Sequence, residues 1–224
     1  MTSRALTDRE FKILVKGTLR DRNKFVGLRD CLMYYLGRYL GFRPKEVRCI
    51  QVSHLNFQER TIFIPSENNK ERHSDNWKIP KIFMLSVMCY LKKTGVHKRS
   101  KWLFPCVHNE YRGKDVPVDS RQHQRNFTER LRRLGFLHIS FIDKQGKPRY
   151  NYNLYSLRKR FGTEVYKATK CPEKTRIMLR QRDRSCRSVW SYIDIEQSEQ
   201  TEKIMGEVYK MGRGVIRPFS PVVT

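Results

Sequence analysis

The stretch Gly41-Phe-Arg-Pro-Lys-Glu46 is the most informative guide to the fold of this 224-residue chain. Upstream of it, from Leu28 onward, apolar residues recur every three and four positions, which predicts a long amphipathic helix that ends at Gly41. Pro44 suits the first turn of a following helix, because the missing N–H of proline has no helical partner there. Arg43 is therefore expected at a sharp junction, where its side chain can be held in one direction.

Apolar periodicity elsewhere predicts an α+β fold that is mainly helical, with a small antiparallel sheet early in the chain. Thr7 and Glu10 have the spacing of a helix-capping pair. Further helices are expected at 81–93, at 120–134 after a cap at Ser120, at 155–169, at 172–182 opened by Pro172, and at about 185–197.

Two segments have the pattern of strands or turns. The residues 61–65 alternate like a strand, 66–76 form a polar turn region, and 77–80 can return as the partner strand, which predicts a β-hairpin with Lys70 near its tip. The segment 136–152 fits either a second short hairpin or a surface loop.

Charge indicates the partner before any motif does. A formal net charge of +25 is the usual mark of a surface that binds a polyanion, and nucleic acid is the first expectation. The longest apolar run, 82–91, is too short to span a bilayer, and the N-terminus lacks the apolar core of a signal peptide. We therefore expect no membrane partner and an intracellular location, in the cytoplasm or nucleoid of a host cell.

Six cysteines lie far apart, without a Cys-x-x-Cys pair. This spacing favours reduced thiols over a zinc site or a disulfide framework. Cys106 and His108 are two metal-ligand types close together, but no second pair follows at a recognisable spacing. We expect neither a metal nor another cofactor.

Basic and phenolic residues that could take part in catalysis are spread along the chain: Arg43, Lys70, Arg158 and Tyr192. Two guanidinium groups can hold a phosphodiester and neutralise the charge that it gains in a transition state. A tyrosine can attack the phosphorus, and a lysine adds a further positive charge. This set of side chains predicts a DNA strand-transfer reaction that needs no metal.

Five motifs appear in the order seen in one known family: Leu6-Thr-Asp-Arg-Glu10, Gly41-Phe-Arg-Pro-Lys-Glu46, the strand pair leading to Ile79-Pro80, Trp102-Leu-Phe-Pro105 and Leu157-Arg-Lys-Arg-Phe-Gly-Thr163, followed by a tyrosine one helix later. Each motif alone is weak, but five in order at sensible spacings are specific. Over residues 6–200 the sequence resembles the catalytic domain of the tyrosine recombinases, the phage integrase family.

The resemblance implies roles for individual residues. Arg43 and Arg158 correspond to the two catalytic arginines that clamp the scissile phosphate. Lys70 corresponds to the lysine at the hairpin tip that protonates the leaving 5′-oxygen, with Lys78 as a second candidate. Glu46 corresponds to an acidic residue that supports the site.

Tyr192 corresponds to the nucleophile, which would leave a 3′-phosphotyrosyl link and a free 5′-hydroxyl. Considered alone, Tyr192 fits a core residue beside Trp190 better than a nucleophile, and only its position one helix after Arg158 favours the catalytic role. Tyr209 is a weaker candidate.

Two positions depart from the family pattern. The residue three before the second arginine is usually histidine, and here it is Tyr155, which can donate a hydrogen bond but is a poor base at neutral pH. This Tyr-x-x-Arg pattern most resembles archaeal integrases of the plasmid-borne type. Nine residues before Tyr192, where relatives have Gly-His, the chain has Arg182 and Asp183.

The resemblance also sets the expected domain organisation. Residues 1–200 correspond to the catalytic domain and 201–224 to a C-terminal tail, while only about forty residues precede Arg43, so we expect no N-terminal core-binding domain. Self-assembly on DNA, as a tetramer, is implied by the family.

Many basic residues outside these motifs exceed what nearby acids can pair, and we expect them to contact the DNA backbone. They are Arg121, Arg125, Arg130, Arg132, Arg133, Lys167, Lys170, Lys174, Arg176, Arg180, Arg184 and Arg187.

Three functions therefore fit the sequence. The first is a site-specific recombinase that serves a mobile element as integrase or excisionase and acts on double-stranded DNA. The second is a type IB topoisomerase-like enzyme, and the third is a non-catalytic nucleic-acid-binding protein that keeps the fold.

Overall fold

A computed structural model describes residues 3–69, 72–107, 113–182 and 189–192, with Ser191 and Tyr192 described in their backbone only. Contacts group residues 1–193 into one unit, which contains every element below. Two predicted site residues, Lys70 and Asp183, lie outside the described residues, and so do Tyr209 and the predicted tail at 201–224.

The first helices form as the capping pattern predicts. Helix α1 spans Asp8–Leu19, and Thr7 and Glu10 cap it reciprocally, each through its side chain. Helix α2 spans Lys24–Leu40 and ends at Gly41 in the left-handed conformation. It begins before Leu28, the first periodic apolar residue, because the side chain of Asn23 accepts a hydrogen bond from the backbone of Val26 and caps the helix.

Next comes a three-stranded antiparallel sheet of β1 (Leu55–Asn56), β2 (Thr61–Ile64) and β3 (Asp75–Lys78), in that order. The return strand lies two residues earlier than the predicted range 77–80. Ile64 pairs with Asp75, which starts the strand, and Pro80 caps the next helix instead of joining the sheet, because proline has no N–H for a ladder. A short turn of 3-10 helix at Ser66–Asn68 follows β2.

The remaining helices are α3 (Pro44–Arg48), α4 (Lys81–Thr94), α5 (Ser120–Arg133), α6 (Tyr155–Thr169) and α7 (Pro172–Met178). Asp119 caps α5, so the prediction of Ser120 as the cap is wrong by one residue: the Asp119 carboxylate accepts from two backbone N–H groups of the first turn. Helix α7 is shorter than predicted because Arg180 takes a left-handed backbone conformation, φ 51°. Within the predicted helix at 185–197, the described residues Val189–Tyr192 form a 3-10 turn.

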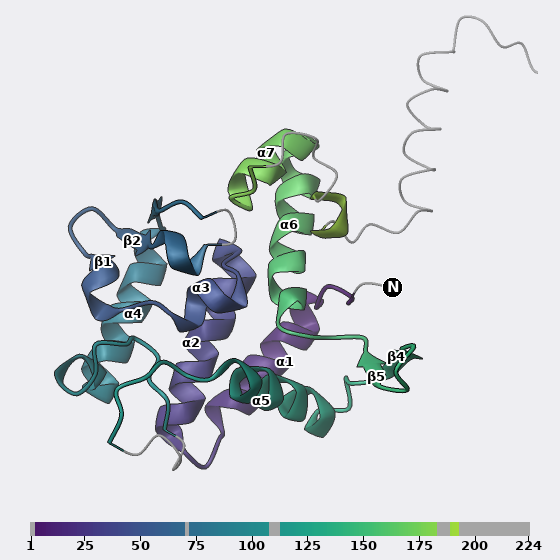
Figure 1. The fold of residues 1–224 in the computed structure, drawn as a ribbon, viewed down its shortest axis with the longest axis horizontal. Coiled ribbons are helices and arrows are strands. Elements are labelled where there is room, and N and C mark those ends of the chain that lie inside the picture. The colour runs from purple at the N-terminus through teal and green to yellow at the C-terminus, as the bar shows by residue number, and fades with distance from the viewer. Residues whose placement is uncertain (1–2, 70–71, 108–112, 183–188, 193–224) are drawn as a thin grey trace, which may run out of the picture. The chain divides into compact units, whose positions relative to one another are not determined.

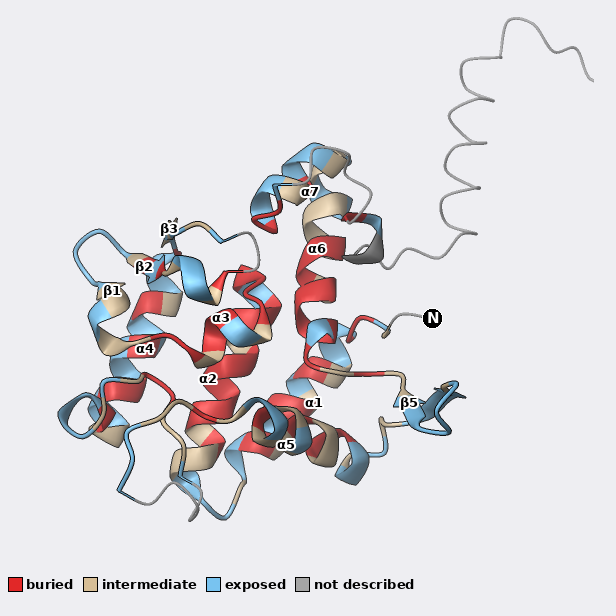
Figure 2. Ribbon diagram, in the orientation of Figure 1, coloured by how far each residue is buried: buried red, intermediate tan, exposed pale blue. Residues whose placement is uncertain are grey.

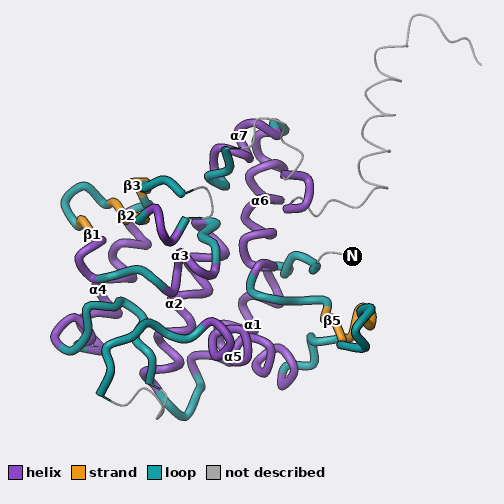
Figure 3. Tube along the Cα trace, viewed as in Figure 1, coloured by secondary structure: helices purple, strands orange, loops and turns teal. Residues whose placement is uncertain are grey.

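The segment before α6 contains the second hairpin, so the hairpin alternative for 136–152 is confirmed. It consists of β4 (Ile139–Ile142) and β5 (Pro148–Tyr150) in antiparallel pairing. Figure 3 shows this hairpin between α5 and α6, separate from the sheet of β1–β3.

Two apolar clusters share α2 as their central helix, and Figure 2 shows α2 and much of α6 as buried. One cluster joins α2 to the three-stranded sheet and α4, around Leu36, Ile62 and Val87. The other joins α2 to α1, α5 and α6, around Leu14 and Phe127. The mainly helical α+β fold is thus confirmed, and α2 fixes the sheet on one side and α6 on the other (Figure 1).

Within the described ranges, no helix has the length and apolar character needed to cross a membrane. In the same residues, no group of three or more His, Cys, Asp or Glu side chains is arranged to hold a metal ion. The five cysteines that these ranges contain are all free.

Candidate functional site

A close contact between α2 and α6 brings Arg158 to its place. Two glycines allow this approach, Gly37 within α2 and Gly41 directly after it: a Cβ on Gly37 would meet Leu157 at 3.2 Å, and one on Gly41 would overlap the ring of Phe161. Gly41 also has φ 64°, which disfavours other residues. Leu157 and Phe161 flank Arg158 on α6, so the contact directs the arginine toward the end of α2.

Arg158 has no exposed surface. Its guanidinium donates hydrogen bonds to the carbonyl oxygens of Gly41 and Leu179. The carbonyl end of a helix carries partial negative charge, which favours a cation at the end of α2. Arg158 therefore ties three segments together: α6, the end of α2 and the end of α7.

Arg43 occupies the N-cap position of α3, as the junction predicts, and is buried. Its Nη1 donates to Oε1 of Glu46 at 2.8 Å and to Oδ1 of Asn69 at 3.3 Å. Nη2 reaches the carbonyl oxygen of Arg180 at 3.5 Å. The backbone N–H of Arg43 also donates to Glu46, so this carboxylate fixes both the side chain and the start of the helix.

A third arginine completes the cluster. Nη2 of Arg180 donates to Oε2 of Glu46 at 2.6 Å, and both side chains are almost fully buried. The guanidinium lies over the ring of Phe42 at 4.4 Å and over that of Trp77 at 4.9 Å. We call Arg43, Arg158, Arg180 and Glu46 the arginine cluster. Because Trp77 belongs to β3, Arg180 links the sheet to the two predicted catalytic arginines.

Glu46 is ionised in this setting. Burial by itself raises the pKa of its carboxyl, but the charges of Arg180, Arg158 and Arg43 and the backbone N–H of Arg43 outweigh burial and hold that pKa below its ordinary value. Burial lowers the pKa of Arg180, against the attraction of Glu46. One carboxylate thus serves as the shared counter-charge of three guanidinium groups.

The sequence did not predict the role of Arg180, which was expected to contact DNA on the surface. It follows α7 in the left-handed position of a Schellman motif, in which its own N–H bonds to Ile177 and that of Gln181 bonds to Arg176. No local signal could have identified it, because it lies within a run of basic residues and its partner Glu46 is 134 positions away.

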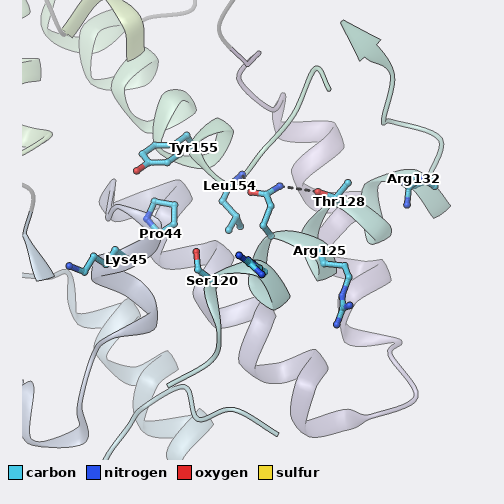
Figure 4. A pocket seen from close by; sticks show the side chains of 10 residues that line it. Pro44, Lys45, Ser120, Arg125, Thr128, Arg132, Leu154 and Tyr155 are labelled. Atoms are coloured by element: carbon cyan, nitrogen blue, oxygen red, sulfur yellow. Dashed lines mark hydrogen bonds between the residues drawn. The ribbon is translucent and has the colours of Figure 1, made fainter. Parts of the chain in front are cut away.

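Tyr155 lies outside the cluster. It is 46% exposed at the first turn of α6 and lines a pocket of about 600 Å³ with Pro44 and Lys45, the residues that follow Arg43. Figure 4 shows Tyr155 and Pro44 on one side of this pocket and Arg125 and Arg132 on the other. Basic side chains from α3 and α5 therefore line the pocket that Tyr155 borders. We call this the basic pocket.

Three other predicted residues, Lys78, Arg182 and Tyr192, have different placements. Lys78 ends β3 and is exposed; because side chains alternate along a strand, it faces away from the side on which Trp77 contacts Arg180. Arg182 is exposed. Asn69, the chain neighbour of Lys70, is buried against Arg43. The 3-10 turn that carries Tyr192 contacts α6, since Trp190 lies edge-on against Tyr166.

The expectation that all the other basic residues contact DNA is wrong for Arg130 as well as for Arg180. Arg130 is buried between α2 and α5, where its guanidinium pairs with Asp30 at 2.6 Å and Asp21 at 2.9 Å. On the surface, Arg132 and Arg133 pair with Glu129, while the half-buried Arg176 pairs with Glu173. Arg121 and Arg125 are exposed at the basic pocket.

Solved structures of several recombinases share this architecture. The crystal structure of XerA recombinase matches with a TM-score of 0.66 at 17% identity, over 92% of this chain and 64% of that one. XerH site-specific recombinase bound to palindromic difH substrate matches with a TM-score of 0.66 at 13% identity, over 92% and 52%. A lambda integrase dimer bound to a COC′ core site matches with a TM-score of 0.59 at 15% identity, over 88% and 50%.

The fold is that of the tyrosine recombinases. The prediction of a tyrosine recombinase catalytic-domain fold is thereby confirmed, whereas the likeness to archaeal plasmid-borne integrases stays a prediction. The chain spans about half to two thirds of the length of these recombinases. A scan against protein-family models finds no match, and a search of the curated proteins finds no significant match.

Proposed function

We propose that this protein is a site-specific DNA recombinase that cleaves and rejoins DNA through a 3′-phosphotyrosyl intermediate. One observation carries the proposal. Arg43 and Arg158 lie far apart in the sequence, yet both bind the same backbone segment, Leu179–Arg180, beside a shared carboxylate in a tyrosine recombinase fold. Two fixed guanidinium groups are suited to hold the non-bridging oxygens of a phosphodiester.

The reaction assigns one task to each residue. The hydroxyl of Tyr192 loses its proton to water as its oxygen attacks the phosphorus, the bond to the 5′-oxygen breaks, and Lys70 gives that oxygen a proton, which it regains from solvent. Arg43 and Arg158 stabilise the added negative charge of the pentacoordinate transition state. Tyr155 donates a hydrogen bond to the phosphate from the side of the basic pocket. The reverse attack by a 5′-hydroxyl of another strand rejoins the DNA and needs no ATP or metal.

Access to the arginines requires a rearrangement in this mechanism. Both guanidinium groups donate to carbonyl oxygens of residues 179–180, which precede the segment that carries Tyr192. A phosphate that binds both arginines takes the place of these carbonyl oxygens. Binding of the DNA phosphate is then coupled to movement of residues 179–180, which precede Tyr192 in the chain.

We extend the proposal to the partner and to the domain organisation. Double-stranded DNA lies across the basic pocket, where Lys45, Arg121 and Arg125 contact its backbone. Residues 1–200 act as the catalytic domain, 201–224 as a tail, and four copies assemble on the DNA.

A second candidate function is a nucleic-acid-binding protein without catalysis. It is favoured by the burial of both arginines, since Arg158 has no exposed surface and Arg43 is 5% exposed. A topoisomerase-like activity is a third, and it differs from recombination in its product: a change in linking number in place of a strand joined to a new partner.

The proposal is tested with a nicked suicide DNA substrate and a denaturing gel. We expect a covalent protein–DNA adduct that maps to Tyr192 and is lost in Tyr192→Phe, while DNA binding is retained. Absence of any adduct, with binding intact, would favour the non-catalytic function. An adduct that persists in Tyr192→Phe would move the nucleophile, with Tyr209 as the next candidate.

A further inference from the structure

The hairpin of β4 and β5 exposes apolar side chains that nothing else in the described residues explains. Ile139 is 60% exposed and Ile142 is 68% exposed, and Phe141 between them is also exposed. Figure 1 shows the hairpin projecting beside α5 and α6. An isolated two-stranded hairpin is marginally stable in water, and exposed apolar strands favour association. These features indicate a partner.

The hairpin is nevertheless built as a rigid unit. At its base, the backbone of His138 donates to Oδ1 of Asn151 at 2.8 Å, and the backbone N–H of Asn151 returns a bond to His138 at 3.0 Å. At its tip, the carboxylate of Asp143 accepts from the backbone of Gln145 and of Lys147, both at 2.9 Å. A preorganised protrusion loses little conformational freedom when it binds.

Charge identifies the kind of partner. Asp143 is the single acidic residue of 136–152, and besides its turn bonds it pairs with Arg149 at 2.7 Å. Lys144 and Lys147 are exposed at the same tip. At the other end, the hairpin connects α5 directly to the first turn of α6, and both of these line the basic pocket. The apolar strand is therefore followed by positive charge at its tip, and the helices on either side of the hairpin in the chain both line the basic pocket.

We infer that the β4–β5 hairpin binds in a groove of duplex DNA, with the two isoleucines against base edges and Lys144 and Lys147 on the phosphates. A groove of B-form DNA admits a two-stranded ribbon, and apolar side chains can contact thymine methyl groups there. The inference rests on the proposed function for its partner, DNA, but not on the covalent chemistry. A second copy of the chain is the competing occupant.

The test compares two double variants of the full chain by affinity for an intact duplex across a salt series. Ile139→Ser/Ile142→Ser should weaken DNA binding about tenfold. The slope of the logarithm of affinity against the logarithm of salt concentration should stay unchanged. Lys144→Ala/Lys147→Ala should reduce the slope by about 1 to 2, since each phosphate contact releases roughly 0.9 counterion. The matched control is Ile82→Ser/Leu85→Ser, which alters two similarly exposed side chains on α4 and should bind as the wild type does.

The outcomes separate this inference from the proposed function. Hairpin variants that bind DNA as tightly as the wild type, with unchanged slopes, would overturn the inference even if adducts form. Loss of self-association in sedimentation, with DNA affinity unchanged, would assign the hairpin to contacts between copies and also overturn it. Weakened binding by the serine variant, in a protein that forms no adduct, would support the hairpin's role while the recombinase proposal fails.

Discussion

The carboxylate of Glu46 lies 2.6 Å from the guanidinium of Arg180, although 134 positions separate the two residues in the sequence. The same carboxylate holds Arg43 at 2.8 Å. Glu46 is therefore the point at which α3 and the end of α7 are joined, and Arg158 lies close enough for its charge to lower the pKa of Glu46.

Glu46→Ala should strongly destabilise the protein, by about 3–5 kcal/mol, because it leaves buried guanidinium groups without their counter-charge. Arg180→Gly should cost less, because glycine relieves the left-handed backbone at this position. Urea unfolding of both single variants and the double variant measures the coupling free energy between the two residues. We expect about 0.5–3 kcal/mol, as is usual for residues in contact. Arg60→Gly is the matched control: Arg60 is also left-handed but exposed, and its replacement should not destabilise. Additive losses would contradict the pairing.

Stability should fall in acid partly through Glu46. Its folded-state pKa lies below the ordinary value of 4.5, so its contribution is complete above about pH 4.5 and is lost as pH falls through the lower, folded-state value. The difference in unfolding free energy between the wild type and Glu46→Gln should therefore be constant from pH 7 to 5 and shrink below 4.5. If this difference in unfolding free energy instead grew as the pH falls, the folded-state pKa of Glu46 would lie above its ordinary value, which would contradict the prediction.

Gly41→Ala should destabilise the protein by about 2 kcal/mol or more, since it combines a left-handed backbone with a side-chain overlap. Gly95→Ala is the control: Gly95 also ends a helix, at φ 62°, but a Cβ there meets nothing within 4 Å. Gly95→Ala should lower the unfolding free energy by only about 1 kcal/mol, which is the cost of a left-handed backbone at alanine. Thermal or urea unfolding of the two variants compares them directly. Equal losses would show that the contact of Gly41 with Phe161 is unimportant.

Arg43→Ala and Arg158→Ala should each slow adduct formation on the suicide substrate by on the order of 10²–10³. DNA affinity should change only modestly, because both arginines act on the transition state more than on the bound duplex. Circular dichroism must first show that each variant is folded, and Arg9→Ala, an exposed arginine on α1, is the control. Wild-type cleavage rates in either variant would remove that residue from the site.

Cleavage should continue in EDTA, because guanidinium groups and a protonating lysine replace the metal ions of a carboxylate nuclease. Binding should weaken steeply as salt rises, since each phosphate neutralised releases roughly 0.9 counterion. Adduct formation with EDTA and affinity over a salt series test both statements on one substrate. Cleavage that is lost in EDTA and restored by magnesium would refute the tyrosine mechanism.

Features that depend on neighbouring residues could be predicted from the sequence. The Thr7 and Glu10 caps, the end of α2 at Gly41 and the start of α3 at Pro44 all depend on residues within one helical turn of one another, so their pattern predicts them. The buried placement of Arg43 beside Glu46 is local in the same sense, since the two are three residues apart.

Which basic residues face solvent depends on long-range packing and could not be predicted from the sequence. Arg130 and Arg180 are indistinguishable in sequence from their exposed neighbours, because each is buried by acidic or aromatic partners from distant segments: Asp30 for Arg130, and Glu46 with Trp77 for Arg180. The burial of a charge depends on where its partner lies after packing, and packing is a non-local property. The contact of Gly41 with Phe161, which brings Arg158 to the end of α2, is fixed by the same long-range packing.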